Sequence, residues 1–578
     1  MQVITRLADL AEPQSYDVVV IGAGGAGLSA ALVAAIEGAR VLLVEHTSYV
    51  GGTTALSAGT TWIPGTHHSA KVNPTDTLAD AAHYLDNAVG ERSPAALRRA
   101  FLETGPEAVR YIESQSEVQY RPYAKHPDYI SDLAGSTLTG RALEPMPFDG
   151  RLLGELFALI RPPIPEFTVL GGMMVDRNDI NHLLGMTQSL ASFQHSLKII
   201  LRHARDRLGH SRGTRLVMGN ALVARLLYSL AQHDKVSLAL NTAVTDIDRG
   251  ADGVEAITLS QQGQQRRVQV KGGVILASGG FNRNPALRKA MLGEVDMSWC
   301  PAAPGHTGQA QELARGLGAH YGPSHGTNAF WAPVSLRKRA DGSTAAFPHF
   351  VMDRAKPGML TVNQAGDRFV NESTSYHLFA LRMQQSLAGG NAAADVPAYL
   401  ICDARALRKY GLGMVRPGGG GLGPFLADGY LTQADSIDEL AGKLGIDPAR
   451  LQASVARIKA YAESGVDPDF RRGETAYQQN IGDATWPGRN PNLGALTEAP
   501  FYAVRLYPGD IGASTGLAAD VDARVLDGAE QPIGGLYAVG NDMHSIMGGV
   551  YTAPGITIGP GLVFGYRAAK HAVARARS

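Results

Sequence analysis

Apolar stretches alternate with glycine-rich turns near the start of the chain. Residues 17–22 are nearly all apolar and mostly β-branched, which predicts a buried parallel strand. A turn with the spacing GxGxxG follows and opens a helix that runs to about residue 38, and a second apolar strand at 41–44 ends in Glu45. This order of strand, glycine turn, helix, strand and acid predicts a dinucleotide-binding unit. A glycine-rich turn without a nucleotide is the weaker alternative.

The residues after Glu45 indicate which dinucleotide this unit binds. The run GGTTALSAG at 51–59 consists mainly of glycine, alanine and short hydroxyl side chains. Backbone amides and small side chains of this kind can approach a second phosphate and a flat ring, for which an NAD-binding domain has no use. FAD is therefore favoured. The cofactor residues expected from these two motifs are Gly22, Gly24, Gly25, Ala26, Gly27, Glu45, Gly52, Thr53, Thr54, Ser57 and Gly59.

The same alternation of strands and helices returns after residue 221 and again at the end of the chain. Apolar strands are predicted at 236–240 and 272–277, and residues 241–244 begin a strand whose backbone could reach an adenine. A helix beginning near residue 556 would aim its positive end at the flavin pyrimidine and stabilise anionic charge there. These segments add Val244, Ala277, Ser278, Gly279, Gly540, Asn541 and Ile558 to the expected cofactor residues.

Two other segments differ from this pattern. Residues 300–499 form a block with long Gly- and Pro-rich loops, interpreted as a substrate-covering domain inserted into the first. Within 155–215, an amphipathic helix is predicted from the spacing of Leu183, Met186, Leu190, Phe193, Leu197 and Ile200. Basic residues accompany and follow this helix: Lys198, Arg202, Arg205, Arg207, Arg212 and Arg215.

Two interpretations of this basic segment stay open. It is either an ordinary helix packed on the body with a solvated basic end, or an interfacial helix that attaches the protein to a membrane. In the second case it would admit sterols directly from lipid.

Composition narrows the function classes. A chain of 578 residues is too long for one core, so at least two domains are expected. The 53 basic and 53 acidic side chains balance, and neither this charge nor the aromatic pattern favours nucleic acid as a partner. Neither a secretory signal core nor an apolar run of about 18 residues is present, which predicts a cytoplasmic protein, at most peripheral on the inner face of the membrane.

The cysteines and histidines suggest no metal centre. Cys300 and Cys402 are the only cysteines, which excludes a disulfide framework and fits a reducing compartment. His67, His68 and His349 have no partner at a metal-ligand spacing, so they are expected to be surface or loop residues. No metal is expected.

Four motifs together resemble a known family. GAGGAG with its later acid, GGTTALSAG, VNQAGDRFVNES and GGLYAVGN resemble the flavoproteins of the fumarate reductase and succinate dehydrogenase superfamily. Within it, the chain is similar to the 3-ketosteroid dehydrogenases, most of all the Δ1 enzymes (3-oxosteroid 1-dehydrogenases). The resemblance implies noncovalent FAD in a Rossmann-like, glutathione-reductase-like domain built from 1–301 and 500–578. It also implies an inserted α+β catalytic domain at 302–499, with 155–215 as an enlarged segment.

Three short patterns carry the site residues that this resemblance implies. In HPDY, Tyr129 matches the family's assisting tyrosine, and in NESTSY, Tyr376 matches its general base. In VYTAPG, Tyr551 and Gly555 match the phenol and the backbone amide that hold the steroid 3-keto oxygen. The implied reaction is 1,2-dehydrogenation of a 3-ketosteroid in steroid or sterol degradation. A tyrosine removes the proton from carbon 2, a hydride passes from carbon 1 to flavin N5, and an external acceptor takes the electrons.

The chemistry of this reaction accounts for the residue types. Two donors at the ketone oxygen stabilise the enolate, and removing one such donor typically costs about 2.7–4 kcal/mol in the barrier. A tyrosine, with an ordinary pKa of about 10, suits the role of base only if neighbours lower that pKa. A hydrogen bond between Tyr129 and Tyr376 is expected to do this.

Three alternatives compete with this interpretation. A fumarate reductase-like enzyme needs an arginine where this chain has Tyr376, and another within GNDMHSIMGGVY, which has none. A 3-ketosteroid 4(5α)-dehydrogenase shares the tyrosines but carries a serine two residues after the ketone-binding tyrosine, where this chain has Ala553. A nonenzymatic flavin-binding or membrane-surface module would lack an assembled catalytic set.

Overall fold

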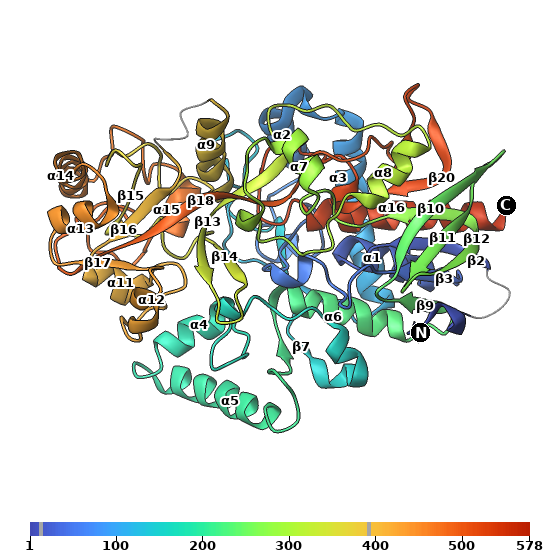
Figure 1. Ribbon diagram of the computed structural model, residues 1–578, viewed down its shortest axis with the longest axis horizontal. Helices are drawn as coiled ribbons and strands as arrows, with labels where there is room; N and C mark the ends of the chain where they lie inside the picture. The colour runs from blue at the N-terminus through green and yellow to red at the C-terminus, as the bar shows by residue number, and fades with distance from the viewer. Residues whose placement is uncertain (11–14, 390–394) are drawn as a thin grey trace.

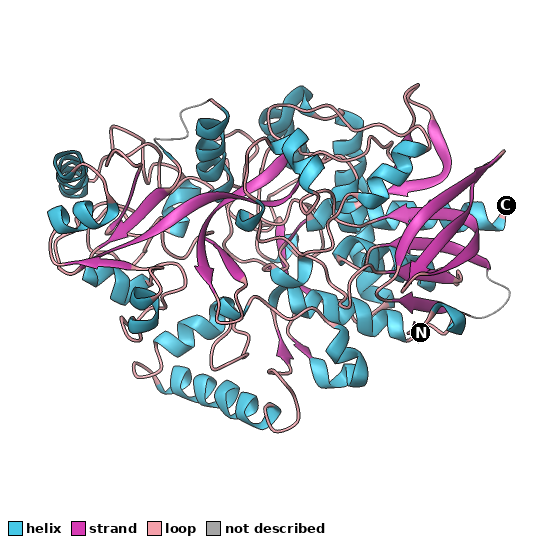
Figure 2. Cartoon of the chain, viewed as in Figure 1, coloured by secondary structure: helices cyan, strands magenta, loops and turns pink. Residues whose placement is uncertain are grey.

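The computed structural model describes residues 1–10, 15–389 and 395–578 (Figure 1). Two main sheets organise the chain: one is built around β2 (Ser15–Ile21), on the right of Figure 1, and the other around β18 (Phe501–Ala513), toward the left. Figure 2 shows helices and strands interspersed throughout. Parallel and antiparallel pairing both occur, so the predicted α/β class is confirmed.

The first sheet has nine strands over the described residues. Its parallel strands are β1 (Gln2–Ile4), β9 (Val236–Ala239), β3 (Val41–Val44), β2, β12 (Gln264–Leu276) and β20 (Pro532–Ala538). Its antiparallel strands are β10 (Ala243–Gly250), β11 (Gly253–Gln261) and β19 (Arg524–Leu526). All four residues of β3 are buried, as expected for a strand with helices or other structure on both faces. The apolar runs at 17–22 and 41–44 thus form neighbouring strands, as predicted.

Helices from opposite ends of the chain meet over this sheet. α1 (Gly25–Ile36) packs against α16 (Ile558–Arg577), and α16 also contacts β12. Glycines on α16 allow the close approach, because a Cβ on Gly561 would lie 3.1 Å from the Cβ of Ala26. α6 (Met218–Ala231) packs on the same helix α1. The nucleotide-type unit is therefore assembled from both termini, close to each other in Figure 1.

The second sheet is antiparallel and has six strands over the described residues. They are β14 (Thr344–Pro348), β13 (Ala329–Lys338), β18, β16 (Ala398–Cys402), β15 (Met359–Val362) and, paired to β18, β17 (Thr432–Ala434). β18 comes from beyond residue 500, where the second part of the cofactor domain is predicted to begin. This strand ties the C-terminal part of the chain to the inserted block, and the domain boundaries themselves stay predictions.

The remaining elements complete both halves. Small sheets are formed by β4 (Thr61–Trp62), β6 (Ala142–Pro145) and β5 (Tyr120–Pro122), and by β7 (Phe148–Asp149) and β8 (Arg215–Leu216). Helices beside the first half include α2 (Leu78–Val89), α3 (Ala95–Gln115), α7 (Pro285–Leu292) and α8 (Gln309–Gly316). Those beside the second sheet are α9 (Tyr376–Ala388), α11 (Ala404–Tyr410), α12 (Gly423–Ala427), α13 (Ile437–Leu444), α14 (Pro448–Ser464) and α15 (Ala476–Ile481).

The segment 155–215 differs from the prediction of a single helix. It forms α4 (Arg177–Leu184) and α5 (Leu190–Asp206), which extend below the body in Figure 1. The break has a local cause: Gly185 is the C-cap of α4, and the Ser189 side chain accepts a hydrogen bond from Ser192 N–H at the start of α5. The side of α5 turned to the protein carries Ser196, Ile199, His203 and Asp206, so the predicted apolar stripe is not its buried face.

Two expectations concerning compartment can be compared with the structure. Over the described residues, no helix combines the length and apolar character needed to cross a bilayer. Cys300 and Cys402 are both free thiols and both buried.

Candidate active site

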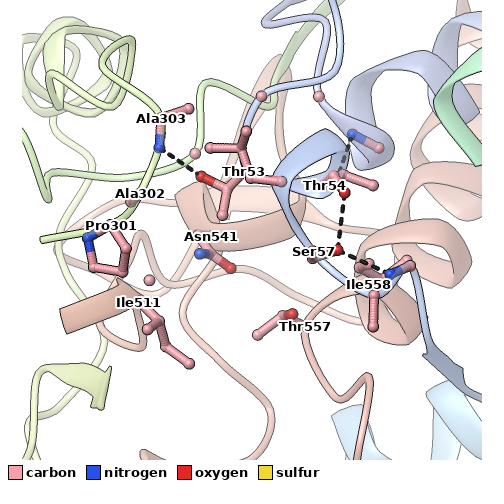
Figure 3. A pocket seen from close by; sticks show the side chains of 18 of the residues that line it. Thr53, Thr54, Ser57, Pro301, Ala302, Ala303, Ile511, Asn541, Thr557 and Ile558 are labelled. Atoms are coloured by element: carbon pink, nitrogen blue, oxygen red, sulfur yellow. Dashed lines mark hydrogen bonds between the residues drawn. The ribbon is translucent and has the colours of Figure 1, made fainter. Parts of the chain in front are cut away.

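A cavity of about 710 Å³ is lined by residues from both halves of the chain, from the glycine turn of α1 to the start of α9. Figure 3 shows the part of it around Thr53, Ala303 and Ile558. Of the residues expected to bind the cofactor or take part in catalysis, all line this cavity except Gly27. Gly27 instead serves the packing of the backbone, since a Cβ there would lie 1.9 Å from the carbonyl oxygen of Gly22. Its missing side chain lets α1 start directly against the end of β2.

The glycine turn leaves the start of α1 open toward this cavity. Gly22 has φ +106°, and a Cβ on it would lie 2.3 Å from the carbonyl oxygen of Ala277, so this position requires glycine. Gly24 is the N-cap of α1 and has no side-chain cap. A Cβ on Gly24 would meet nothing within 4 Å. Free space in front of an uncapped helix N-terminus suits a phosphate group.

Glu45 lies at the end of β3 with its carboxylate held in place. Its Oε2 accepts a hydrogen bond from Ala23 N–H at 2.9 Å, and its Oε1 accepts from the N–H and hydroxyl of Thr47 at 2.9 and 2.8 Å. The side chain is buried and lines the cavity. A fixed carboxylate with remaining lone pairs is what ribose hydroxyls require.

Short hydroxyl side chains line the middle of the cavity. Thr53 Oγ1 accepts a hydrogen bond from Ala303 N–H at 2.9 Å, and Thr54 Oγ1 accepts from Gly25 N–H at 3.2 Å (Figure 3). The Ser57 hydroxyl donates to the Thr54 carbonyl at 2.8 Å. The run 51–59 therefore joins the start of α1 to the segment around residue 303.

Two polar side chains at this end were not predicted. His306 Nε2 lies 3.3 Å from Thr53 Oγ1, and burial lowers the pKa of His306 to about 3. Arg161 donates to Thr47 Oγ1 at 2.8 Å. His306 Nδ1 and Arg161 Nε are buried, and no described residue hydrogen-bonds to them. The open start of α1, the fixed Glu45 carboxylate, the short hydroxyl side chains and these free polar atoms together fit the phosphates, ribose and ring of FAD. Both residues lie in loops outside every motif, so periodicity gave no signal for them.

The start of α16 reaches the same cavity from the other end of the chain. Thr557 is its N-cap, without a side-chain cap, and Ile558 is its first residue. Both line the cavity beside Asn541, and Figure 3 shows these three residues near the Thr54–Ser57 turn. The predicted helix start near residue 556 is confirmed within two residues, and its action on a flavin stays a prediction.

Three tyrosines meet in the wall of the same cavity. The ring centroids of Tyr129, Tyr376 and Tyr551 are separated by 5.2 to 5.7 Å, and none of the three is more than 8% exposed. The Tyr129 hydroxyl donates to the Tyr376 hydroxyl at 3.4 Å. Tyr129 N–H also donates to the Thr552 carbonyl at 2.8 Å, next to Tyr551. Tyr376 is the first residue of α9. Tyr129 and Tyr376 are 247 residues apart in sequence.

Gly555 presents its backbone to the same space. It has φ +91°, and a Cβ on it would lie 2.4 Å from the carbonyl oxygen of Thr60, so only glycine fits. Its carbonyl accepts a hydrogen bond from Trp62 N–H at 3.2 Å. Among the described residues, none accepts a hydrogen bond from the Gly555 N–H. A free amide and the Tyr551 hydroxyl therefore remain as donors in a buried, largely apolar site.

The pKa expectation for the base is corrected by the structure. Burial raises the pKa of Tyr376 well above its ordinary range, and the neighbouring phenols of Tyr129 and Tyr551 raise it further. Burial likewise raises the pKa of Tyr129 and of Tyr551. The three phenols are therefore neutral near pH 7, because burial disfavours the charged form of each.

Sequence reasoning also missed the side chains that pack this cluster. Phe330 on β13 lies 5.1 Å from the Tyr551 ring, Phe350 lies 4.8 Å from the Tyr376 ring, and Tyr477 on α15 lies 4.7 Å from the Tyr129 ring. Tyr477 is itself buried, and burial raises its pKa to about 12. These aromatic residues occur singly in the sequence, so only their three-dimensional placement reveals them.

Arg354 supports the cluster from behind. It is fully buried, and its guanidinium donates to the carbonyls of His349, Phe350, Glu372 and Thr374 at 3.1, 2.9, 2.6 and 2.6 Å. Two of these carbonyls directly precede α9, so the cation fixes the segment that delivers Tyr376. Arg354 lies within the inserted block but outside every motif.

The histidines expected at the surface or in loops do lie in loops, and the structure adds that two of them, His68 and His349, are buried. His349 Nδ1 lies 2.6 Å from Asp353, and His68 Nε2 lies 2.9 Å from Glu113. His67, His68 and Glu113 bring three ligand-type atoms within 4.8 Å of one another, a grouping hidden from sequence spacing. His68 Nδ1 has no hydrogen-bond partner among the described residues, whereas a metal-bound imidazole typically donates its other ring N–H to an acceptor.

Comparisons with known proteins bear on the whole chain. Residues 17–558 match the family model of the FAD binding domain. The chain is 37% identical to a 4-oxocyclohex-2-ene-1-carboxylate 5-dehydrogenase of Sinomonas cyclohexanicum, over 96% of this chain and 93% of that protein. It is 35% identical to a 3-oxosteroid 1-dehydrogenase of Mycolicibacterium smegmatis, over 96% of this chain and 97% of that protein.

A solved structure extends this likeness to three dimensions. The crystal structure of 3-ketosteroid Δ1-dehydrogenase from Sterolibacterium denitrificans, in complex with 1,4-androstadiene-3,17-dione, matches with a TM-score of 0.89. The two chains are 33% identical, and the match covers 97% of this chain and 100% of that one.

Proposed function

The chain belongs to the FAD binding domain family, in the group that contains the 3-oxosteroid 1-dehydrogenases, and from this premise we propose that it introduces the 1,2 double bond into 3-ketosteroids. FAD is its cofactor, and the chain is an FAD-dependent oxidoreductase. The observation that carries the proposal is the convergence of Tyr129, Tyr376, Tyr551 and the free Gly555 amide at one end of the cofactor cavity.

The ketone end of the substrate is held by two donors. The Tyr551 hydroxyl and the Gly555 N–H donate to the 3-keto oxygen and stabilise the negative charge that develops there. In a buried site such donors act with little screening by water. Polarising the ketone acidifies the proton on carbon 2, next to it.

Tyr376 removes that proton as the phenolate, after its own hydroxyl proton has left to solvent. Because burial raises the pKa of this phenol, the phenolate is a minor form at neutral pH, and the step depends on the held ketone acidifying carbon 2. Tyr129, bonded to it at 3.4 Å, fixes the direction of its hydroxyl. Bound FAD supplies the acceptor for the hydride from carbon 1. An external electron acceptor completes the turnover, and steroid or sterol degradation is the context that the relatives suggest.

The alternatives lose support in this geometry. A dicarboxylate substrate requires free cations at the reacting carbon, and the nearby cation Arg354 is engaged by four backbone carbonyls. For the 4(5α) reaction, the residue two after Tyr551 is Ala553, which is fully buried and provides no hydroxyl.

Anaerobic flavin reduction tests the proposed function. Mixing the oxidised holoenzyme with androst-4-ene-3,17-dione should bleach the flavin absorbance without an added reductant. Succinate serves as the matched negative control. Absence of bleaching with any 3-ketosteroid would contradict the proposal.

We propose in addition that α5 attaches the enzyme to a membrane surface. Its outward stripe consists of Leu190, Phe193, Leu197 and Leu201, which are 39 to 71% exposed. Lys198 and Arg205 lie along the same side of the helix and are exposed, whereas Arg202 and Arg215 are engaged by acidic side chains. An apolar stripe flanked by free cations fits the boundary between headgroups and acyl chains of an anionic bilayer. This surface would let apolar sterols reach the enzyme from lipid.

Vesicle cosedimentation tests the membrane proposal. Replacing Leu190, Leu197 and Leu201 together by serine should abolish cosedimentation with vesicles that contain phosphatidylglycerol. Turnover of a dissolved ketosteroid should stay unchanged. A matched control replaces Val466 by serine, an exposed apolar residue (57%) remote in sequence from this helix. Unchanged cosedimentation of the triple variant would refute the proposal.

A second class of ketone is a candidate substrate and can be tested in the same flavin-reduction assay. The Sinomonas relative acts, by its name, on a cyclohexene ketone that also carries a carboxylate. The reacting group, a ring ketone with hydrogen on its neighbouring carbons, is the same in both classes. The site described above does not distinguish them, because it contacts only the ketone and the carbons beside it.

A further inference from the structure

Lys356 is a cation in the cavity wall that lacks a carboxylate partner. Its ammonium donates to the carbonyls of Ile481 and Gly482 at 2.8 and 2.7 Å. An ammonium has three donors, so one is left for the cavity that Lys356 lines. No carboxylate of the described residues lies within 4.0 Å of it. The two acids that act on its charge, Asp483 and Asp353, are engaged by Lys409 and His349.

Arg177 is a second cation on the same wall. It is the first residue of α4, and its guanidinium lies 4.6 Å above the ring of Tyr123. Over the described residues it forms no ion pair. Its charge lowers the pKa of Lys356, so the two cations act on one another. A site that concentrates two unpaired cations favours an anionic ligand.

The acids that line this part of the cavity do not offset them. Glu144 and Asp176 also line it, and Arg121 engages both: its guanidinium lies 2.8 Å from Glu144 and 3.6 Å from Asp176. Asp176 additionally caps α4 by accepting a hydrogen bond from Asp179 N–H. Two arginines thus face these two acids, since Arg215 also lies 3.9 Å from Asp176, whereas Lys356 and Arg177 pair with no acid among the described residues.

Helix α15 relates the position of Lys356 to the tyrosine cluster. Tyr477, whose ring lies 4.7 Å from Tyr129, and Ile481, which holds the Lys356 ammonium, are on the single helix α15. Four residues of helix rise by about 6 Å. The cation thus lies beyond the tyrosine cluster, about one helical turn along the wall, on the side of Tyr129.

We propose that Lys356, assisted by Arg177, is a carboxylate subsite, so that the preferred substrate is a ring ketone carrying a carboxylate at the end opposite the ketone. This inference rests on the proposed function, because the ketone must be held at Tyr551 and Gly555 for the carboxylate to reach Lys356. Two kinds of molecule combine a ring ketone with such a carboxylate. One is a monocyclic oxocyclohexane carboxylate, and the other is a 3-ketosteroid whose side chain ends in a carboxylate.

Matched acids and esters separate charge recognition from ketone chemistry. The holoenzyme is reduced anaerobically with 4-oxocyclohexane-1-carboxylate and its methyl ester, and with 3-oxoandrost-4-ene-17β-carboxylate and its methyl ester. The wild-type enzyme should bind at least one acid about 10-fold or more tightly than its ester, because a hydrogen bond to a charged group is the strong kind. The pair that shows the preference identifies the source.

Lys356→Met should remove this preference while leaving the ester unchanged. The substitution keeps the length of the side chain and deletes its charge. Lys459→Met, on the exposed face of α14, is the matched control with the same change in net charge. Lys356→Arg keeps the positive charge and should therefore retain part of the preference for the acid. This variant shows whether the loss in Lys356→Met comes from the charge or from a folding defect. Equal effects on acid and ester, or no acid preference in the wild type, would overturn the subsite.

A binding experiment keeps the subsite testable apart from the reaction. The oxidised holoenzyme is titrated with 4-hydroxybenzoate and with methyl 4-hydroxybenzoate, and binding is followed by the flavin absorbance. Tighter binding of the acid in the wild type, lost in Lys356→Met, supports the subsite. If no ketone bleaches the flavin, the proposed function fails, and this titration still decides whether Lys356 binds a carboxylate.

Discussion

At the scale of single residues, Tyr376 is a buried phenol for which we propose the role of a base. A buried phenol resists ionisation, because the charged form loses its hydration. The same burial excludes water from the enolate and strengthens the two donors at the ketone oxygen. The arrangement therefore combines a poor resting base with a strongly acidified substrate, and both effects come from one apolar enclosure.

Two conservative substitutions separate these roles. Tyr376→Phe should lower the rate of flavin reduction by about 10²-fold or more, since it deletes the group that takes the proton. Tyr551→Phe should lower the rate by about 10²-fold and also weaken ketone binding, since it deletes one donor to the oxygen. Stopped-flow flavin absorbance measures both, with the FAD content as the control for folding. Either variant reacting at the wild-type rate would refute the role assigned to that residue.

The raised pKa of Tyr376 has a defined consequence for pH dependence. Below its pKa, the fraction of phenolate increases with pH. Because burial moves this pKa upward, the rate of flavin reduction by androst-4-ene-3,17-dione should rise through pH 7–9 without reaching a plateau. Burial lowers the pKa of Lys356 to about 8, so this side chain also titrates in this range. Because androst-4-ene-3,17-dione is uncharged, the titration of Lys356 should not affect the measured rate. A rate that is flat or falls over this range would contradict the assignment.

At the scale of elements, the glycines of the turn between β2 and α1 have two different roles. Gly22 and Gly27 are required by neighbouring backbone, whereas Gly24 faces open space with φ −76°. A side chain at Gly24 should therefore change the stability of the protein little. It would, however, block the approach of a ligand to the start of α1. The same motif thus contains two glycines that the fold requires and one for which we propose a role in binding the cofactor.

Alanine substitutions test this division. Gly24→Ala should change the free energy of unfolding of the apoprotein by less than about 0.5 kcal/mol while weakening FAD binding. Gly22→Ala and Gly27→Ala should destabilise the apoprotein itself, because a Cβ would lie 2.3 and 1.9 Å from backbone oxygen. Thermal unfolding and flavin titration measure the two effects. Full FAD affinity in Gly24→Ala would argue against phosphate binding at this turn.

The helix pair α4 and α5 shows where a sequence pattern misleads. The spacing of Leu190, Phe193 and Leu197 correctly marks one face of a helix, but it does not say what that face contacts. The structure turns Ser196, His203 and Asp206 inward, where Asp206 accepts hydrogen bonds from Thr214, and leaves the leucines outside. Periodicity cannot reveal this, because it treats burial in protein and burial in lipid alike.

At the scale of the whole molecule, motifs predicted the parts of the site whose residues are fixed by local backbone. The glycine turn, Glu45, the hydroxyl run and the start of α16 are found where the sequence puts them, since each depends on a short local geometry. Tyr129, Tyr376 and Tyr551 were found through resemblance, and the fold brings them together. The domain boundaries remain a prediction, and β18 shows why: one strand can serve the block on the other side of a boundary.

The rest of the site depends on contacts between distant segments. Lys356 and Arg354 are ordinary basic residues in the sequence. Only their tertiary placement shows that Lys356 pairs with no acid among the described residues and that Arg354 donates to four backbone carbonyls. The buried positions of His68 and His349 follow likewise from distant partners, Glu113 and Ser335. The spacing of residues along the sequence does not predict contacts between such distant partners.

Product analysis with a saturated ketone tests the central claim most directly. The holoenzyme, with an artificial electron acceptor, is incubated with 5α-androstane-3,17-dione, and the product is identified by NMR. The account predicts a double bond between carbons 1 and 2, formed by wild-type enzyme and not by Tyr376→Phe. A double bond between carbons 4 and 5, or the same product from the variant at the wild-type rate, would contradict it.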